Sequence, residues 1–308
     1  MSRLLETQVS FGPYGTVFED RGPKIGIPDL DKSANILNGG RYREEHLRLA
    51  QQYLQAGARV ATTNTFGARH ALKRNDLPLY RELIEAHVDV VREALQGTKR
   101  RSLAISFGPY GTDCYNPEDA PAGENESRDF HAEQFAVARE LWEKAGIDVA
   151  VAETISTGRE GLGVVLAAQK LGLPVIPSFV IDKDANLFDG EPLVEALKRI
   201  DAATGASALG YGINCCPIEG AETALSVANG MRHRILMVYP NASSEDPRKL
   251  QETQGVVHLH DHEGTAKQIV EMVRRNPSIR VVGGCCGYDQ KAIRTLAHHA
   301  KGERVALR

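Results

Sequence analysis

The sequence lacks the features of several large classes of protein. Its 308 residues contain no apolar run near the roughly 18 residues that a membrane-spanning helix needs. The N-terminal segment MSRLLETQVSFGPYG has neither the apolar core nor the small-residue cleavage site of a secretory signal peptide. The net charge of −3 gives no electrostatic attraction to nucleic acid or to an anionic membrane. These absences predict a cytoplasmic protein whose partners are small molecules.

Two further absences bear on the fold. The chain has no GxGxxG loop after its first expected strand, so neither a nucleotide-binding open sheet nor a nicotinamide cofactor is expected. No linker or low-complexity segment divides it. Instead, eight short apolar runs alternate with eight longer segments of helical period. This alternation predicts one (β/α)8 barrel domain over residues 1–308.

The expected elements follow one another in strict order. The strands are expected at 7–12, 58–65, 102–108, 148–155, 174–181, 208–215, 234–241 and 280–287. The helices are expected at 43–57, 77–95, 130–146, 158–172, 192–205, 221–231, 266–276 and 290–300.

The heptapeptide SFGPYGT occurs twice, at 10–16 and at 106–112. Its glycines and proline are typical of a tight turn, and the two copies close the first and third expected strands. Alternate strands of an eight-stranded barrel send side chains into the same interior layer. The copies are therefore expected to form like-shaped exits into one mouth of the barrel, each presenting a tyrosine, Tyr14 and Tyr110.

The five cysteines are unevenly spread. Cys215 and Cys216 stand in GINCCP, Cys285 and Cys286 stand in GGCCG, and Cys114 is alone in a long loop. The two pairs end the sixth and eighth expected strands, so both reach the catalytic face of a barrel, where thiolates suit Zn²⁺. Three ligands would leave one position for a substrate, and four would make a closed structural site. Buried free cysteines and a vicinal disulfide are the alternatives, and Cys114 is interpreted as an ordinary thiol.

These motifs resemble those of the zinc-dependent homocysteine S-methyltransferases, a family that includes betaine- and S-methylmethionine-dependent enzymes. The resemblance extends over nearly the whole chain. It is most specific at GINC and GGCCG and weaker at TTNTF, SFGPYG, ETI, PVIPSF and VYPN. It implies one zinc ion per chain, held by Cys215, Cys285 and Cys286, with Cys216 as a neighbour. It also implies methyl transfer from a sulfonium or quaternary ammonium donor to a thiol, homocysteine, without a protein nucleophile.

The resemblance further implies a set of substrate contacts. Glu153, in ETI, matches a family acid that contacts the amino group of homocysteine. Asn64 in TTNTF and Asn214 in GINC are expected beside the substrate. A cationic donor favours an aromatic lining. The candidates for this lining are Tyr14, Phe66, Tyr110 and Tyr239.

The first copy of SFGPYGT departs from the family pattern. Aligned through Gly15 and Thr16, it places Phe11 in the acceptor pocket, where the family has an Asp that helps hold the amino group. A phenyl ring cannot accept a hydrogen bond from an ammonium group. The acceptor is therefore either homocysteine held by Glu153 alone or a different thiol.

Two further hypotheses about function stay open at this point. The same zinc–thiolate chemistry could demethylate a methylated substrate, or the chain could be a non-catalytic zinc protein with four cysteine ligands. Barrels of this family can form homo-oligomers, but no sequence feature marks an interface.

The run HLHDH at 258–262 has histidines at metal-like spacing. It falls between the seventh strand and its helix, away from the cysteines. An ordinary loop is expected there, with the helix starting at Asp261 or Thr265.

Overall fold

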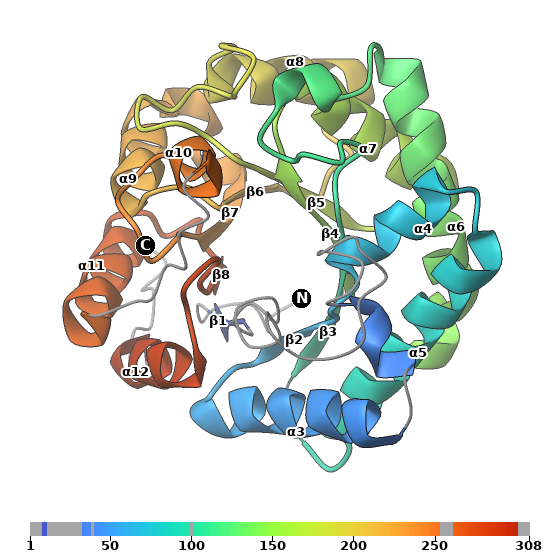
Figure 1. Cartoon of the computed structure of the whole chain (residues 1–308). Helices are drawn as coiled ribbons and strands as arrows, with labels where there is room; N and C mark the ends of the chain where they lie inside the picture. Colours follow the sequence, from blue (N-terminus) through green and yellow to red (C-terminus); the bar gives the residue numbers. More distant parts are fainter. Residues whose placement is uncertain (1–7, 11–32, 38–39, 99–100, 253–260, 301–308) are drawn as a thin grey trace.

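The chain is described by a computed structural model over residues 8–10, 33–37, 40–98, 101–252 and 261–300. Eight parallel strands form its centre, and a ring of helices surrounds them (Figure 1). The strands are β1 (Gln8–Val9), β2 (Val60–Thr62), β3 (Ser102–Phe107), β4 (Val149–Ile155), β5 (Val175–Phe179), β6 (Tyr211–Asn214), β7 (Ile235–Tyr239) and β8 (Val281–Val282).

The sheet closes on itself. Its strands follow the order β1-β8-β7-β6-β5-β4-β3-β2, so β1 and β2 stand at the two ends of the order. A parallel bridge between Ser10 and Val60 joins these ends. On the same seam, the Arg59 amide donates to the Val9 carbonyl at 2.7 Å. The predicted (β/α)8 barrel is confirmed.

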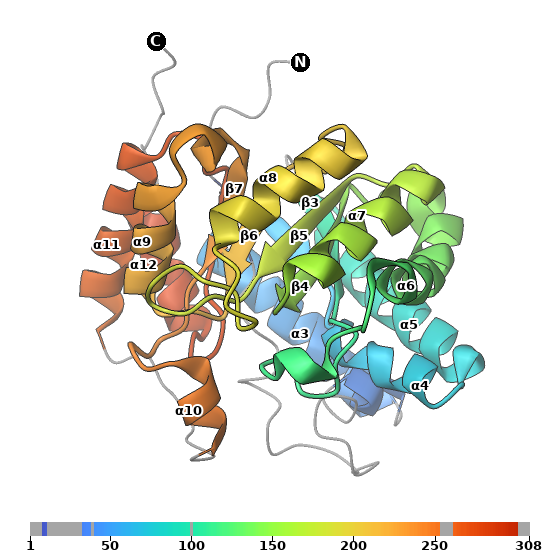
Figure 2. The ribbon, with the colours of Figure 1, turned by 90° about the horizontal axis from the view of Figure 1, so that it is seen from above.

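The helices also follow the prediction. The long ones are α3 (Gly40–Ala56), α5 (Leu77–Leu95), α6 (Glu124–Ala145), α7 (Gly158–Leu171), α8 (Leu193–Thr204), α9 (Ile218–Val227), α11 (His262–Arg275) and α12 (Gln290–Ala300). Two short helices, α4 (Arg69–Lys73) and α10 (Pro247–Glu252), lie in the loops after β2 and β7, at the same end of the barrel (Figure 2). The 3-10 segments are η1 (Asn35–Leu37), η2 (Phe66–Ala68), η3 (Pro117–Asp119) and η4 (Asn229–Arg234).

Strand alternation divides the core into two layers. In β3, Leu103, Ile105 and Phe107 pack outward in the large core that also contains helix side chains, and Ala104 faces the barrel interior. Since side chains alternate along a strand, Ser106 also points inward. The interior layer consists of Val60, Ala104, Val151, Ile176, Met237 and Tyr239. The carboxyl ends of the strands carry the polar side chains of the site.

Within the described ranges, no helix combines the length and apolar character needed to cross a bilayer.

Candidate active site

Three cysteine sulfurs converge at the carboxyl ends of β6 and β8. Cys215 Sγ lies 2.8 Å from Cys285 Sγ and 3.8 Å from Cys286 Sγ, and all three lie within 4.8 Å of one another. Cys215 is buried, Cys285 is partly exposed and Cys286 is exposed. Among the residues that the structure describes, no other group of three His, Cys, Asp or Glu side chains is spaced to hold a metal ion. The structure thus brings together the three predicted ligands, here called the thiol cluster.

A glycine turn brings the two adjacent cysteines to one side. β8 ends at Val282, and Gly283 and Gly284 follow it. A Cβ atom at Gly284 would lie 1.9 Å from the Tyr288 ring, so only glycine fits there without displacing the ring. Strand alternation has therefore ended before the cysteines begin.

The end of β7 holds this turn in place. The Cys285 amide donates to the Pro240 carbonyl at 2.8 Å, and the Cys286 amide donates to Asn241 Oδ1 at 3.2 Å. The VYPN segment, a weak motif in the sequence, thus supports the backbone of two cluster cysteines.

Cys216 takes a different direction from Cys215. Cys215 has a φ of +54°, in the left-handed region, so the chain turns sharply where β6 ends. Cys216 is fully buried in the core between strands and helices, and this burial raises its pKa to about 12. As predicted, Cys216 is a neighbour of the thiol cluster and not a member. Cys114 is partly exposed in the loop after β3.

Three side chains from rim loops pack against the thiol cluster: Tyr115, Val180 and Phe188, here called the rim cluster. Tyr115 Oη lies 3.2 Å from Cys215 Sγ, and the Tyr115 ring meets the Phe188 ring edge to face at 6.2 Å. Burial raises the pKa of the Tyr115 phenol well above its usual value. The phenol therefore keeps its proton and can donate it in a hydrogen bond to sulfur.

The rim cluster is supported from the loop after β7. The Arg248 guanidinium lies 4.3 Å from the Phe188 ring centroid. Arg248 is itself fixed by Asp246, with nitrogen–oxygen distances of 2.9 and 2.6 Å. Sequence reasoning missed both Tyr115 and Phe188. The one signal for Tyr115 was its place in the long loop after the third expected strand, which a barrel carries over its catalytic face.

Glu153 is the carboxyl group predicted to contact the amino group of the acceptor. Ser106, the serine of the second SFGPYGT copy, donates to Glu153 Oε1 at 2.6 Å. Burial raises the pKa of Glu153 to about 6, with the Ser106 hydrogen bond opposing the rise and the charge of Cys286 adding to it. This carboxyl therefore changes charge near neutral pH, beside the sulfurs.

Asn64 lies buried just after β2, between two threonines that fix β3. The hydroxyls of Thr63 and Thr65 bond to each other at 2.7 Å. Thr65 donates to the Ser106 carbonyl at 2.5 Å, and the Ser106 amide donates to Thr63 at 3.1 Å. The TTNTF segment thus holds the backbone of the serine that contacts Glu153.

Asn214 lies fully buried at the end of β6. Its side chain bonds to Thr154, the residue after Glu153, and to Ser178 of β5. Thr154 has a φ of +61°, where a β-branched residue costs roughly 1–3 kcal/mol. Such a conformation persists only where its surroundings enforce it, and Asn214 is the visible constraint.

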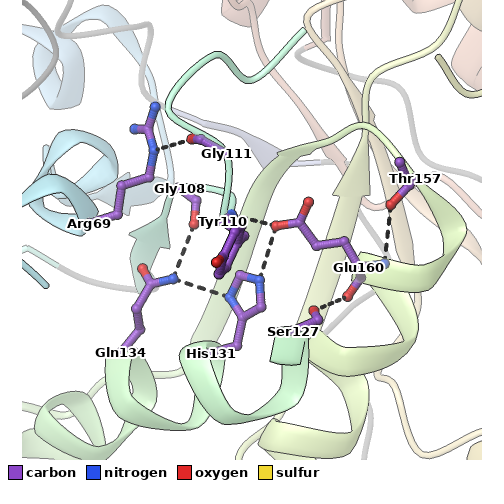
Figure 3. A network of polar contacts seen from close by, with 9 residues as sticks. All are labelled: Arg69, Gly108, Tyr110, Gly111, Ser127, His131, Gln134, Thr157 and Glu160. Carbon is purple, nitrogen blue, oxygen red and sulfur yellow. Dashed lines mark hydrogen bonds and ion pairs between the residues drawn. The ribbon is translucent and has the colours of Figure 1, made fainter. Parts of the chain in front are cut away.

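The second copy of SFGPYGT is held by a buried polar network (Figure 3). Glu160 Oε1 accepts hydrogen bonds from the Tyr110 amide and from His131 Nε2, the latter at 3.1 Å. Gln134 Nε2 lies 3.1 Å from His131 Nδ1 and 3.2 Å from the Gly108 carbonyl. These bonds fix the exit of β3, which leads into the loop that carries Tyr115.

The Tyr110 side chain, predicted to line the donor site, contacts Lys73, Phe130 and Glu126. The Lys73 ammonium lies 3.8 Å from its ring centroid, and Phe130 packs edge-on at 5.0 Å. Its hydroxyl donates to Glu126 at 2.7 Å. None of these three neighbours belongs to the thiol cluster or to the rim cluster. The Phe66 ring likewise contacts a cation, because the Arg69 guanidinium lies 4.4 Å from its centroid.

Of the first SFGPYGT copy, only Ser10 falls within the described residues; Phe11 and Tyr14 lie outside them. Ser10 Oγ lies 3.1 Å from Thr62 Oγ1. Of the predicted aromatic lining, Tyr239 faces the barrel interior, where Cys285 packs against the same layer.

The HLHDH run falls partly outside the described residues, which include neither His258 nor His260. The predicted helix start at Asp261 is confirmed, because its side chain accepts from the Gly264 amide at 2.8 Å as the N-cap of α11.

Comparison with known proteins decides the family. The profile described as homocysteine S-methyltransferase matches residues 10–300. The chain belongs to the homocysteine S-methyltransferase family. This membership supports methyl transfer as its activity.

Curated members of the family align over most of the chain. The homocysteine S-methyltransferase of Escherichia coli (strain K12) is 28% identical over 89% of each chain. The betaine–homocysteine S-methyltransferase 1 of Rattus norvegicus is 25% identical, covering 100% of this chain and 76% of its own length. The solved structure of the Escherichia coli homocysteine methyltransferase MmuM in its metallated form shares the fold, with a TM-score of 0.71, 23% identity and coverage of 95% of this chain and 96% of that one.

The donor set of this family member suits a soft divalent metal. Tetrahedral Zn–S bonds of about 2.3 Å place neighbouring sulfurs about 3.8 Å apart. The Cys215–Cys286 separation of 3.8 Å has this value, and the Cys215–Cys285 separation of 2.8 Å would have to widen. Three convergent thiols, one of them exposed, therefore fit a metal ion with a position left for a ligand.

Proposed function

We propose that this chain transfers a methyl group from a sulfonium or quaternary ammonium donor to the thiol of homocysteine, giving methionine, with one zinc ion held by Cys215, Cys285 and Cys286. The observation that carries the proposal is the thiol cluster itself: three sulfurs from two separate strand ends converge at the mouth of a barrel of this family. When bound, zinc supplies the deprotonation of the acceptor thiol at neutral pH.

The protein's own groups would bind and orient the acceptor. Glu153 is the carboxylate available for the amino group of homocysteine, and Ser106 holds one of its oxygens at 2.6 Å. Phe11 stands in the sequence where the family has a second acid, so Glu153 would carry this contact alone. An acceptor without an amino group is the alternative that a screen of thiols must test.

The rim cluster would exclude water and line the donor site. Tyr115 and Phe188 pack against Cys215, and their aromatic rings would favour a cationic donor beside the sulfurs. Tyr239, in the interior layer beside Cys285, is the third aromatic side chain available to this pocket. The chemistry then needs proximity and an in-line approach, with no covalent intermediate on the protein.

An open three-sulfur site is favoured over a closed four-cysteine site by the placement of Cys216. Its thiol lies in the apolar core and outside the thiol cluster. The cytoplasmic location, the extent of one domain over 1–308 and any homo-oligomer remain predictions.

The proposal is tested by zinc analysis and acceptor screening on purified protein. One zinc per chain is expected, together with methyl transfer from labelled betaine or S-methylmethionine to homocysteine that stops after chelation and returns with zinc. Cys215→Ala should lose both zinc and activity. Cys216→Ala is the matched control and should retain zinc. Equal zinc loss in both variants would contradict the open site, and full activity after chelation would contradict the use of zinc.

A further inference from the structure

Asn214 ties three strands together beneath the site. Its Oδ1 accepts from the Thr154 amide at 3.0 Å and from the Ser178 hydroxyl at 2.7 Å, and its Nδ2 donates to Thr154 Oγ1 at 2.9 Å. β4 and β6 are not neighbours in the sheet, because β5 lies between them. One amide therefore links the strand that carries Glu153 to the strand that leads into Cys215.

The link falls on a β-bulge. Ala152 of β4 lies opposite Pro177, but Ile155 lies opposite Phe179. Between these two pairs β4 advances by three residues and β5 by two, so β4 contains one extra residue. Ile155 packs in the outer core, whereas unbroken alternation after Glu153 would turn it into the barrel. The bulge thus turns Ile155 away from the barrel interior, into which Glu153 points.

The bulge and the end of β6 are both held in the left-handed region. Thr154 has a φ of +61° and Cys215 a φ of +54°. The register shift takes the Thr154 amide out of the β4–β5 ladder, and Asn214 Oδ1 supplies its partner. Glu153 directly precedes the first of these residues, and Asn214 directly precedes the second. The Cys215 backbone is also held by β7, because its amide donates to the Tyr239 carbonyl at 3.1 Å. The position of the carboxyl group relative to the cluster sulfur therefore depends on Asn214.

We propose that Asn214 is a positioning residue, which fixes Glu153 relative to the thiol cluster by clamping the β4 bulge. This inference deepens the proposed function and rests on it, since Glu153 is there the contact for the acceptor's amino group. Asn214 is 0% exposed, and its side-chain hydrogen bonds run to Thr154 and Ser178. It acts through Glu153 and not by touching the substrate.

Calorimetric titration of zinc-loaded protein tests this without turnover. The two probes are homocysteine and 4-mercaptobutanoate, the same thiol acid without the amino group. Wild type should prefer homocysteine, and Glu153→Gln should abolish the preference. Asn214→Ala should weaken homocysteine binding by about tenfold or more while leaving 4-mercaptobutanoate within about twofold. The double variant should bind homocysteine no more weakly than Glu153→Gln alone, because residues acting as one unit are non-additive.

Two further variants make the test specific. Thr154→Val removes the hydroxyl that accepts from Asn214 Nδ2 but keeps the hydrogen bond from the backbone amide of residue 154 to Asn214 Oδ1. It should therefore weaken homocysteine binding less than Asn214→Ala does. Ser178→Ala removes another bond of the same amide and should give a partial loss of preference; it replaces Asn214→Ala if that variant does not fold.

The outcomes separate the two proposals. Additive effects in the double variant, or equal weakening of both probes by Asn214→Ala, would overturn the positioning role. If wild type binds neither probe, the proposed function fails, and the clamp is then judged by the crystal structures of the Asn214→Ala and Ser178→Ala variants. A displaced Glu153 carboxyl supports it, and an unmoved one overturns it.

Discussion

Tyr115 Oη lies 3.2 Å from Cys215 Sγ, although one comes from the loop after β3 and the other from the end of β6. The phenol keeps its proton, so it can donate to the sulfur of Cys215, one of the proposed zinc ligands. Groups that bond to metal ligands commonly contribute about 10- to 100-fold to metal affinity.

Tyr115→Phe should therefore weaken zinc binding by about tenfold, because it deletes that donor and keeps the ring that packs on Phe188. Competition with a chromophoric chelator measures the affinity. Tyr110→Phe is the matched control, since the Tyr110 hydroxyl bonds to Glu126 instead. Unchanged affinity in Tyr115→Phe would show that the contact does not stabilise the metal site.

Glu153→Gln should make the folded protein more stable near pH 8 while it weakens the acceptor site. Burial raises the pKa of Glu153 from 4.5 to about 6, so its stabilising contribution is complete below pH 4.5 and is lost as the pH rises through 6. At 1.36 kcal/mol per pKa unit, the variant should gain up to about 2 kcal/mol at pH 8. Urea unfolding of both proteins at pH 4.5 and pH 8 measures this. A gain of equal size at both pH values would rule out the buried charge as its cause.

Acid should destabilise the fold through two buried histidines. The rings of His46 and His87 meet at 5.0 Å, and His87 Nε2 bonds to the Ser33 carbonyl at 2.9 Å. Burial lowers the pKa of His46 to about 2 and that of His87 to about 4. Both are neutral in the folded state, so their contribution is present above pH 6.5 and is lost as the pH falls toward 4.

The expected loss between pH 7 and pH 5 is about 2 kcal/mol for each of these histidines. His87→Gln, which can still donate to the Ser33 carbonyl, should flatten the pH dependence of the free energy of unfolding. Substitution of His233, an exposed histidine, should leave that dependence unchanged. A wild-type unfolding free energy that is flat from pH 7 to pH 5 would be incompatible with two buried neutral rings.

Gly284→Ala should damage the zinc site through the backbone. The new methyl group would lie 1.9 Å from the Tyr288 ring, so either the ring or the turn bearing Cys285 has to move. Overpacking of this kind costs roughly 1–3 kcal/mol, and zinc content should fall with it. Gly123→Ala, where no atom lies within 4 Å, is the control. Retention of wild-type zinc content and stability by Gly284→Ala would show that the turn tolerates the shift.

The features that depend on local pattern were predictable from the sequence. Apolar runs and helical periods predicted all eight strand–helix units. The cysteine pairs at two strand ends predicted a metal site, and the family resemblance singled out Cys215, Cys285 and Cys286, whose sulfurs converge in the structure. The resemblance also implied that Cys216 is a neighbour only, and in the structure Cys216 lies outside the thiol cluster.

The remaining features depend on contacts between distant segments. Tyr115 and Phe188 meet over Cys215 only because loops after β3 and β5 converge there. The bulge at Thr154 is stabilised by the side-chain amide of Asn214 from β6, and no neighbouring residue in the sequence predicts a φ of +61° at this position. Ser106 belongs to the repeated SFGPYGT segment, but its hydrogen bond to Glu153 could not be predicted without the register between β3 and β4.

The most direct measurement is zinc K-edge X-ray absorption of the purified protein before and after addition of homocysteine. Three protein sulfurs around one zinc are expected at first, rising to four sulfurs at about 2.3 Å once homocysteine is added. Absence of zinc, or four sulfurs already present without homocysteine, would contradict an open three-cysteine site for the acceptor thiol.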